Sequence, residues 1–251
     1  MGYYRGCDTP HCPLPICERT LAVVLRLMPV FELEPGNLAR RYAGSRDSPD
    51  TNAPDDAWEA WLLACLRDAG IDDLRPIAKR SWLFSIEQLQ RVTTMERILE
   101  DHFDKSGSTM ADAATDRKNR AALAGGFVLM AGQGVLVEPG CCCDLSNLAE
   151  WAQAAHALDG SWKMLWIGHP WRSVRLAGGA LEISAAHEGS PQALEVACRV
   201  DAAELADAVE RARVALHALA DRLYAAIVIH VGSPSLAASL ARSLAGLDAS
   251  D

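Results

Sequence analysis

The chain has 251 residues, of which 50% are hydrophobic and 23% charged, and its formal net charge is -9. This composition is typical of a globular protein and excludes a chain that is disordered throughout. The negative charge argues against nucleic acid as a partner, because affinity for phosphates comes largely from Lys and Arg. No window reaches the roughly 18–20 apolar residues of a membrane span, and no secretory signal is recognised. We therefore expect a cytoplasmic protein that does not bind membranes.

The N-terminal part of the sequence is predicted to be mainly helical. Residues 1–20 combine cysteines with prolines and indicate an irregular arm. Residues 21–33 are apolar and fit a buried strand or a short helix, with the strand favoured. The spacing of apolar residues between Trp58 and Leu66 predicts a helix that ends before Gly70. A further helix is expected from about Ser85 to about Asp104.

The chain is expected to divide near its middle. Residues 105–120 are small, polar and charged, which is typical of an exposed linker. We therefore predict a mainly helical region over 1–104, with its Cys/Pro-rich arm, and an α+β domain over 121–251. The segment after Arg120 has a net charge of -6, compared with -3 for the segment before it.

The C-terminal part alternates short β-type runs with helical patterns, and a long helix should begin after the cap residue Asp201. The expected elements are a hairpin at 126–130 and 134–137, a short helix from about Leu148, a strand at 161–167, a hairpin at 173–176 and 181–184, a strand at 194–200, the long helix, an apolar segment at 227–231 and a last helix from Ser233–Pro234. The fold class is therefore α+β, with a helical N-terminal part and a C-terminal, mostly antiparallel sheet with packed helices.

Three consecutive cysteines, Cys141, Cys142 and Cys143, lie at the expected turn from a strand into a helix. We favour the interpretation that they are small buried residues, because free cysteine is among the most buried residue types. A helix N-terminus stabilises a thiolate, so a reactive thiol or a zinc site with His169 or His187 is the alternative. A disulfide between neighbours is a further alternative. The paired spacing of known zinc sites is absent.

A second set of possible ligands lies in the N-terminal arm, where Cys7, Cys12 and Cys17 accompany His11. Their spacing is looser than that of a zinc knuckle, so an arm without metal is favoured. The irregular placement of all eight cysteines in a chain of this length indicates reduced thiols rather than a disulfide framework.

The aromatic segment from Trp162 to Trp171 could line a recognition surface, because Trp is enriched where partners bind. The same residues at strand spacing are also good core residues. We assign Trp166 to the core, and Trp171 and His169 to the surface. No Walker A loop, dinucleotide-binding glycine motif, nucleophile elbow or H-E-x-x-H motif is present in the sequence, which favours a protein that is not an enzyme.

Between Val135 and Ile183, the runs EPGCCCDLSNLAEW and WKMLWIGHPW resemble bacterial immunity-type proteins, which neutralise polymorphic or contact-delivered toxins. The resemblance implies a cytosolic binding protein of α+β fold. The acidic C-terminal half would then mask a basic toxin domain. The expected partner-binding residues are His169, Trp171, Glu182 and Glu188. The sequence does not predict the oligomeric state.

Two other functions stay open. The chain could be a thiol- or zinc-dependent sensor or enzyme that uses the residues Cys141–Cys143. It could also be a scaffold or assembly subunit.

Overall fold

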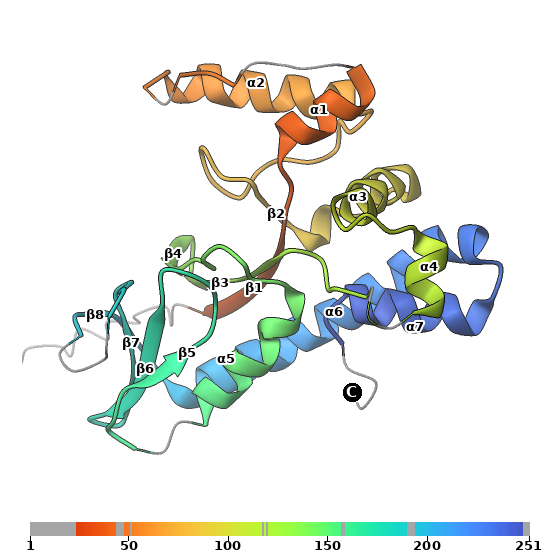
Figure 1. Cartoon of the computed structure of the whole chain (residues 1–251). Helices are drawn as coiled ribbons and strands as arrows, with labels where there is room; N and C mark the ends of the chain where they lie inside the picture. The colour runs from red at the N-terminus through yellow and green to blue at the C-terminus, as the bar shows by residue number, and fades with distance from the viewer. Residues whose placement is uncertain are drawn as a thin grey trace, which may run out of the picture.

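The computed structural model describes residues 24–43, 48–50, 52–116, 118, 120–156, 159–189 and 194–247. Within these residues the protein is α+β, with two four-stranded antiparallel sheets and seven α-helices (Figure 1). The strands are β1 Leu25–Glu32, β2 Leu83–Ser85, β3 Gly125–Ala131, β4 Gly134–Val137, β5 Lys163–Leu165, β6 Arg172–Ala177, β7 Ala180–Ser184 and β8 Val196–Val200. The helices are α1 Pro35–Ala43, α2 Asp55–Asp68, α3 Val92–Lys105, α4 Met110–Thr115, α5 Leu148–Ala155, α6 Ala202–Val231 and α7 Pro234–Leu244, with short 3-10 helices η1 Ile86–Gln88 and η3 Leu145–Asn147.

The first sheet has the strand order β2-β1-β3-β4. Its two central strands are rich in apolar side chains, and Phe31 and Phe127 are fully buried. Helix α6 packs against β1 (Figure 1). Two arginines of α6 donate hydrogen bonds to backbone carbonyls of neighbouring segments. Arg211 donates to the carbonyl of Leu25 at 2.9 Å, and Arg222 donates to that of Ile86 at 3.2 Å. Buried carbonyl groups need hydrogen-bond donors, so these two bonds hold α6 against β1 and η1.

The second sheet has the order β5-β6-β7-β8 and lies at one end of α5 and α6 (Figure 1). Alternation along its strands gives it two unlike faces. The inner face carries buried apolar residues that join the main core, including Leu165, Val174, Leu181 and Ile183. Helix α5 contacts both β5 and α6, and so connects this sheet to the rest of the molecule.

The structure corrects the expected distribution of helices and strands. The N-terminal part is not simply helical, because β1 and β2 belong to the first sheet, and the longest helix, α6, is C-terminal. β1 pairs along most of its length with β3, from Leu25 opposite Ala131 to Phe31 opposite Gly125. An apolar strand must pair its backbone groups, and its partner here lies about 100 residues later in the sequence. The first sheet therefore joins strands from both sides of the expected boundary.

The segment expected to be an exposed linker contains helix α4, and that part of the prediction is wrong. Thr109 and Asp112 form a capping box at its start, and Ala113 and Ala114 are fully buried. Alanine-rich turns show little apolar periodicity, yet they pack closely against other helices, here α6 and α7. Whether 1–104 and 121–251 fold as separate units stays a prediction.

Most of the other expected elements are confirmed, with shifted ends. The expected helix from Ser85 is divided, because Ser85 caps η1 and α3 begins only at Val92. Asp201 caps α6 by accepting from two backbone amides, as predicted. The apolar segment 227–231 is the last part of α6 rather than a separate element. The arm at 1–20 lies outside the described residues.

Among the described residues, α6 is the one helix long and apolar enough to cross a membrane by length and composition. The buried core helix of a soluble protein meets the same two criteria, so the observation is weak evidence for a membrane span. Ten of its residues, from Leu205 to Ile227, are buried against the rest of the protein.

Candidate functional site

The outer face of the second sheet turns away from the core and carries a row of charged and aromatic residues across the strands. We define the outer face by Trp162, Met164, Trp171, Arg175, Glu182 and Arg199. The register places Arg175 opposite Glu182, and Glu182 opposite Arg199. The Arg175 guanidinium also lies 4.4 Å from the ring centre of Trp162, within the range of a cation–π interaction. Side chains from four neighbouring segments thus form one row across this face of the sheet.

Glu182 is the buried centre of this row, although the sequence suggested a carboxylate available to a partner. Its residue surface is only 3% exposed. Its two carboxylate oxygens lie 2.7 Å from the guanidinium nitrogens of Arg175 and Arg199. Hydrogen bonds from Arg175 and then Arg199 lower the pKa of Glu182 below its ordinary value. Glu182 therefore organises the outer face and positions the two arginines.

Two large apolar side chains in and just after β5 are exposed. Met164 is 49% exposed and Trp166 is 47% exposed, so the assignment of Trp166 to the core is wrong. Trp166 follows the end of β5, where its carbonyl accepts a hydrogen bond from the Asn147 amide at 3.1 Å. The chain leaves the sheet at this point, and strand alternation no longer decides which side chains are buried. The fully buried tryptophan is Trp151, on α5.

Three of the four expected partner-binding residues come together at the edge of the outer face. His169 Nε2 lies 2.7 Å from Glu188 Oε2, and the rings of His169 and Trp171 meet edge to face at 5.7 Å. Trp171 also exchanges two backbone hydrogen bonds with His187, at 3.0 and 2.9 Å. Residues far apart in sequence thus form a small polar and aromatic cluster. The sequence did not predict the position of His187, whose Nε2 lies 3.1 Å from Ser173 Oγ.

The three consecutive cysteines lie in two different environments. Cys143 is buried, as the packing interpretation predicted, and its burial raises the pKa of its thiol to about 12. Cys141 and Cys142 are exposed, so the same interpretation is wrong for them. The pKa of Cys142 is also raised, mainly by its hydrogen bond to Cys141. For Cys142 and Cys143, the expected lowering of the thiol pKa at a helix N-terminus is therefore not observed.

The zinc hypothesis is not supported by the arrangement of possible ligands in the described part of the chain. No group of three or more His, Cys, Asp or Glu residues is arranged there to hold a metal ion. Cys141 and Cys142 are exposed, whereas Cys143 is buried, so the three thiols do not share one environment. The second possible set, Cys7, Cys12, Cys17 and His11, lies outside the described residues.

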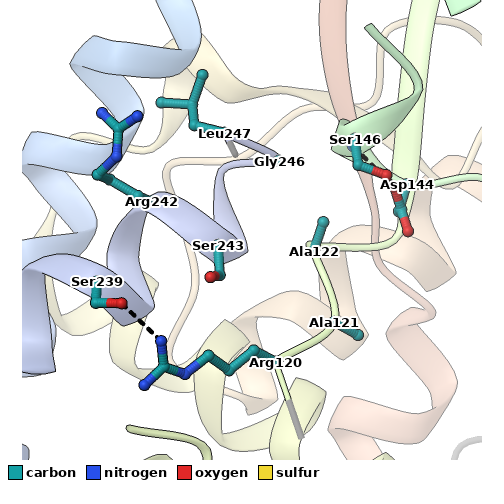
Figure 2. Close-up of a pocket in the computed structure, with 10 residues that line it drawn as sticks. All are labelled: Arg120, Ala121, Ala122, Asp144, Ser146, Ser239, Arg242, Ser243, Gly246 and Leu247. Atoms are coloured by element: carbon teal, nitrogen blue, oxygen red, sulfur yellow. Dashed lines mark hydrogen bonds between the residues drawn. The ribbon is translucent and has the colours of Figure 1, made fainter. Parts of the chain in front are cut away.

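A cavity of about 530 Å³ lies between α7, η3 and the segment that enters β3 (Figure 2). Arg120 reaches across its edge, and its guanidinium donates to the carbonyls of Ala113 and Ala114 and to Ser239 Oγ. Asp144 accepts from the backbone and the hydroxyl of Ser146 at 2.8 and 2.5 Å. These polar groups close helix ends and join α4 to α7, which is a structural role. This cavity was not predicted from the sequence, because its lining residues come from three separate segments.

Comparisons with protein-family models, with curated proteins and with solved structures found no match. The candidate site therefore depends on the geometry of this chain alone, and the outer face of the second sheet, with its edge cluster, is its best-defined surface.

Proposed function

We propose that this chain is a cytoplasmic immunity-type binding protein that neutralises a bacterial toxin through the outer face of its second sheet. The observation that carries the proposal is the group of partly exposed aromatic and apolar side chains around an ordered Arg–Glu–Arg row. Tryptophan and arginine are the residue types that most often supply binding energy at protein interfaces. The resemblance of residues 135–183 to immunity-type proteins covers β5, β6 and most of β7.

The order of this surface supports binding without a large rearrangement. Arg175 is held between Trp162 and Glu182, and His169 is held by Glu188. A side chain that is already fixed loses little conformational entropy when a partner binds. The outer face can therefore act as a preformed surface.

The negative charge of the chain supports a basic partner, but Glu182 is not the carboxylate that would contact it. Glu182 is neutralised by two arginines, whereas the Glu188 carboxylate is 71% exposed at the edge of the face. The chain as a whole carries a net charge of -9, which would attract a basic toxin domain over a distance and accelerate association at low salt. Tryptophans would then supply most of the binding energy at close range.

The experiment compares three forms of the full chain: wild type, the double variant Met164→Ala/Trp171→Ala, and the double variant Val214→Ala/Ile229→Ala. The last pair lies on α6, where both side chains are exposed, and serves as the matched control. Each tagged form is used to isolate partners from its native cells, and the partner is then expressed alone in a test host.

We expect a partner that arrests growth alone, and whose toxicity is suppressed by the wild type and by the α6 control. The outer-face variant should lose at least about tenfold in affinity, since each truncated anchor removes on the order of 1–2 kcal/mol. A partner that is not toxic, or equal protection by the outer-face variant, would contradict the proposal.

A further inference from the structure

Cys141 and Cys142 form a pair of thiols that the proposed binding function does not use. Both residues are exposed, and their side chains are hydrogen-bonded to each other. The third cysteine of the run is separate, because Cys143 is buried and its sulfur packs so closely on Gly168 that a Cβ there would lie 2.6 Å from it. Two adjacent thiols are thus in contact at the surface, while their neighbour is protected.

Small molecules can reach Cys141 from an open groove of about 380 Å³. The groove lies between the loop 78–83 and the segment 138–141, and Cys141 lines it together with Lys79 and Glu138. Exposure to a groove of this size admits a hydroperoxide, whose reaction with thiols depends on access as well as on thiolate content.

The backbone connects the thiol pair to the edge of the outer face. Cys141 donates to the carbonyl of His169 at 3.0 Å, and His169 donates back to the carbonyl of Cys141 at 3.2 Å. Gly140 donates to the carbonyl of Ile167 at 2.7 Å. Cys142 follows with a φ of 64°, a left-handed conformation that L residues rarely adopt. A change in the backbone at residues 141–142 would therefore reach His169 directly.

We propose that Cys141 and Cys142 are a modification site at which a hydroperoxide forms a disulfide between adjacent residues. One thiol attacks the peroxide, so that its sulfur gains an oxygen and becomes a sulfenic acid while an alcohol, or water in the case of hydrogen peroxide, leaves. The second thiol then attacks the sulfenic sulfur, the S–S bond forms, and a water molecule leaves. The protein loses two protons and two electrons, which the peroxide accepts.

This disulfide should be reversible and should disturb the local backbone. Adjacent Cα atoms are only about 3.8 Å apart, which is shorter than the roughly 4.4–6.8 Å of most disulfides. Closing the ring therefore requires movement at residues 141–142, and strained disulfides are reduced more readily. The hydrogen bonds between Cys141 and His169 should weaken when the ring forms.

The test treats the reduced full chain with one equivalent of hydrogen peroxide, blocks remaining thiols with N-ethylmaleimide under denaturing conditions, and maps the peptides by mass spectrometry. The peptide that contains residues 141–143 should lose the mass of two hydrogens and take up a single maleimide, at Cys143. Reduction should restore three maleimides. Three maleimides without reduction, a sulfinic acid at either residue, or a bridge to Cys7, Cys12 or Cys17 would overturn the proposal.

Variants separate the pair from its neighbours. Cys141→Ser and Cys142→Ser should each abolish the disulfide and leave a sulfenic acid that a dimedone probe labels. Cys143→Ser should keep the disulfide, and Cys198→Ser serves the same purpose if the buried substitution prevents folding. Loss of the disulfide in Cys198→Ser would overturn the assignment.

Hydrogen exchange tests the connection to His169 without any partner. In the oxidised wild type, the amides of Cys141 and His169 should exchange about tenfold faster than in the reduced protein, because their mutual hydrogen bonds open more often. Unchanged exchange would overturn the proposed effect on the His169 turn. Because this readout needs no toxin, the modification site can succeed or fail independently of the proposed function.

Discussion

The two sheets have the same number of strands and the same antiparallel pairing, but they use their faces differently. In the first sheet, the central strands β1 and β3 are mostly buried, and α6 lies against β1. In the second sheet, buried leucine, isoleucine and valine residues lie on one face, while the other carries Trp162, Met164 and the Arg175–Glu182–Arg199 row. The first sheet therefore holds the fold together, and the second presents a surface.

This difference teaches that strand count and topology do not indicate which sheet keeps an exposed face. The elements that pack against each sheet decide this. α6 lies against β1, whereas the second sheet joins the core through its inner face, contacts α5, and is connected to Gly140 and Cys141 by backbone hydrogen bonds at Ile167 and His169. Substitutions in the first sheet should mainly change stability, and substitutions on the outer face of the second should mainly change binding.

The largest expected effect is the loss of a core side chain from the first sheet. Phe127 on β3 is 1% exposed. Phe127→Ala should lower the free energy of unfolding by about 3–5 kcal/mol, because it removes apolar contacts and leaves a cavity. Urea unfolding at neutral pH measures this change. A loss below about 1 kcal/mol would indicate that the first sheet is not the stabilising core.

The second-largest loss of stability is expected at the junction between the two sheets, where Gly168 lies. Gly168 has a φ of 95°, and an added Cβ would lie 2.5 Å from the carbonyl oxygen of Cys141. Gly168→Ala should cost about 2–4 kcal/mol, since it combines a strained backbone with a backbone clash. Gly178→Ala is the matched control, because Gly178 has a φ of 61° but nothing within 4 Å of its added Cβ, and it should cost only about 1–2 kcal/mol. Equal losses of unfolding free energy for the two variants would show that the backbone around Gly168 is not closely packed.

Substitution of Glu182 should change the stability of the fold in a pH-dependent way. Arg175 and Arg199 lower the pKa of Glu182, so the folded state favours the deprotonated carboxylate more strongly than the unfolded state does. This contribution to stability is present above the unfolded pKa and is lost as the pH falls through the lower folded pKa. Glu182→Gln should therefore be less stable than wild type at pH 7, and the difference should shrink as the solution is acidified below the ordinary value of 4.5.

Thermal unfolding from pH 7 downward measures this convergence. Glu188→Gln provides the control, because it removes the same charge from an exposed carboxylate, and exposed ion pairs contribute little. A Glu182→Gln difference that is constant with pH would mean that the ion pairs with the two arginines do not stabilise the folded state.

The smallest effect on stability is expected on the outer face itself. Met164 is largely exposed, so Met164→Ala should change the free energy of unfolding by no more than about 0.5 kcal/mol. Denaturant unfolding of the purified variant tests this expectation, in parallel with Phe127→Ala. A loss of more than about 1 kcal/mol would show that another part of the protein covers this face.

Local signals in the sequence were sufficient for several elements. The apolar spacing from Trp58 to Leu66 predicted α2, because helical periodicity is a property of neighbouring residues. Asp201 predicted the start of α6 through its side-chain cap, and glycines between apolar runs predicted both hairpins. His169, Trp171 and Glu188 were also identified beforehand as residues of a possible binding surface, a role that stays a prediction. Their mutual contacts were not predicted, since they depend on how two loops pack.

By itself, the sequence determined the α+β class, the hairpins and the starts of α6 and α7, because these depend on contacts between residues close in the chain. Only the tertiary structure decided that β1 pairs with β3, that Glu182 is buried between two arginines, and that Cys143 is buried while Cys141 and Cys142 are exposed. Each of these outcomes depends on which distant segment covers a residue. Composition and periodicity indicate which environment a side chain favours. Whether the side chain is buried depends on which distant segments pack against it.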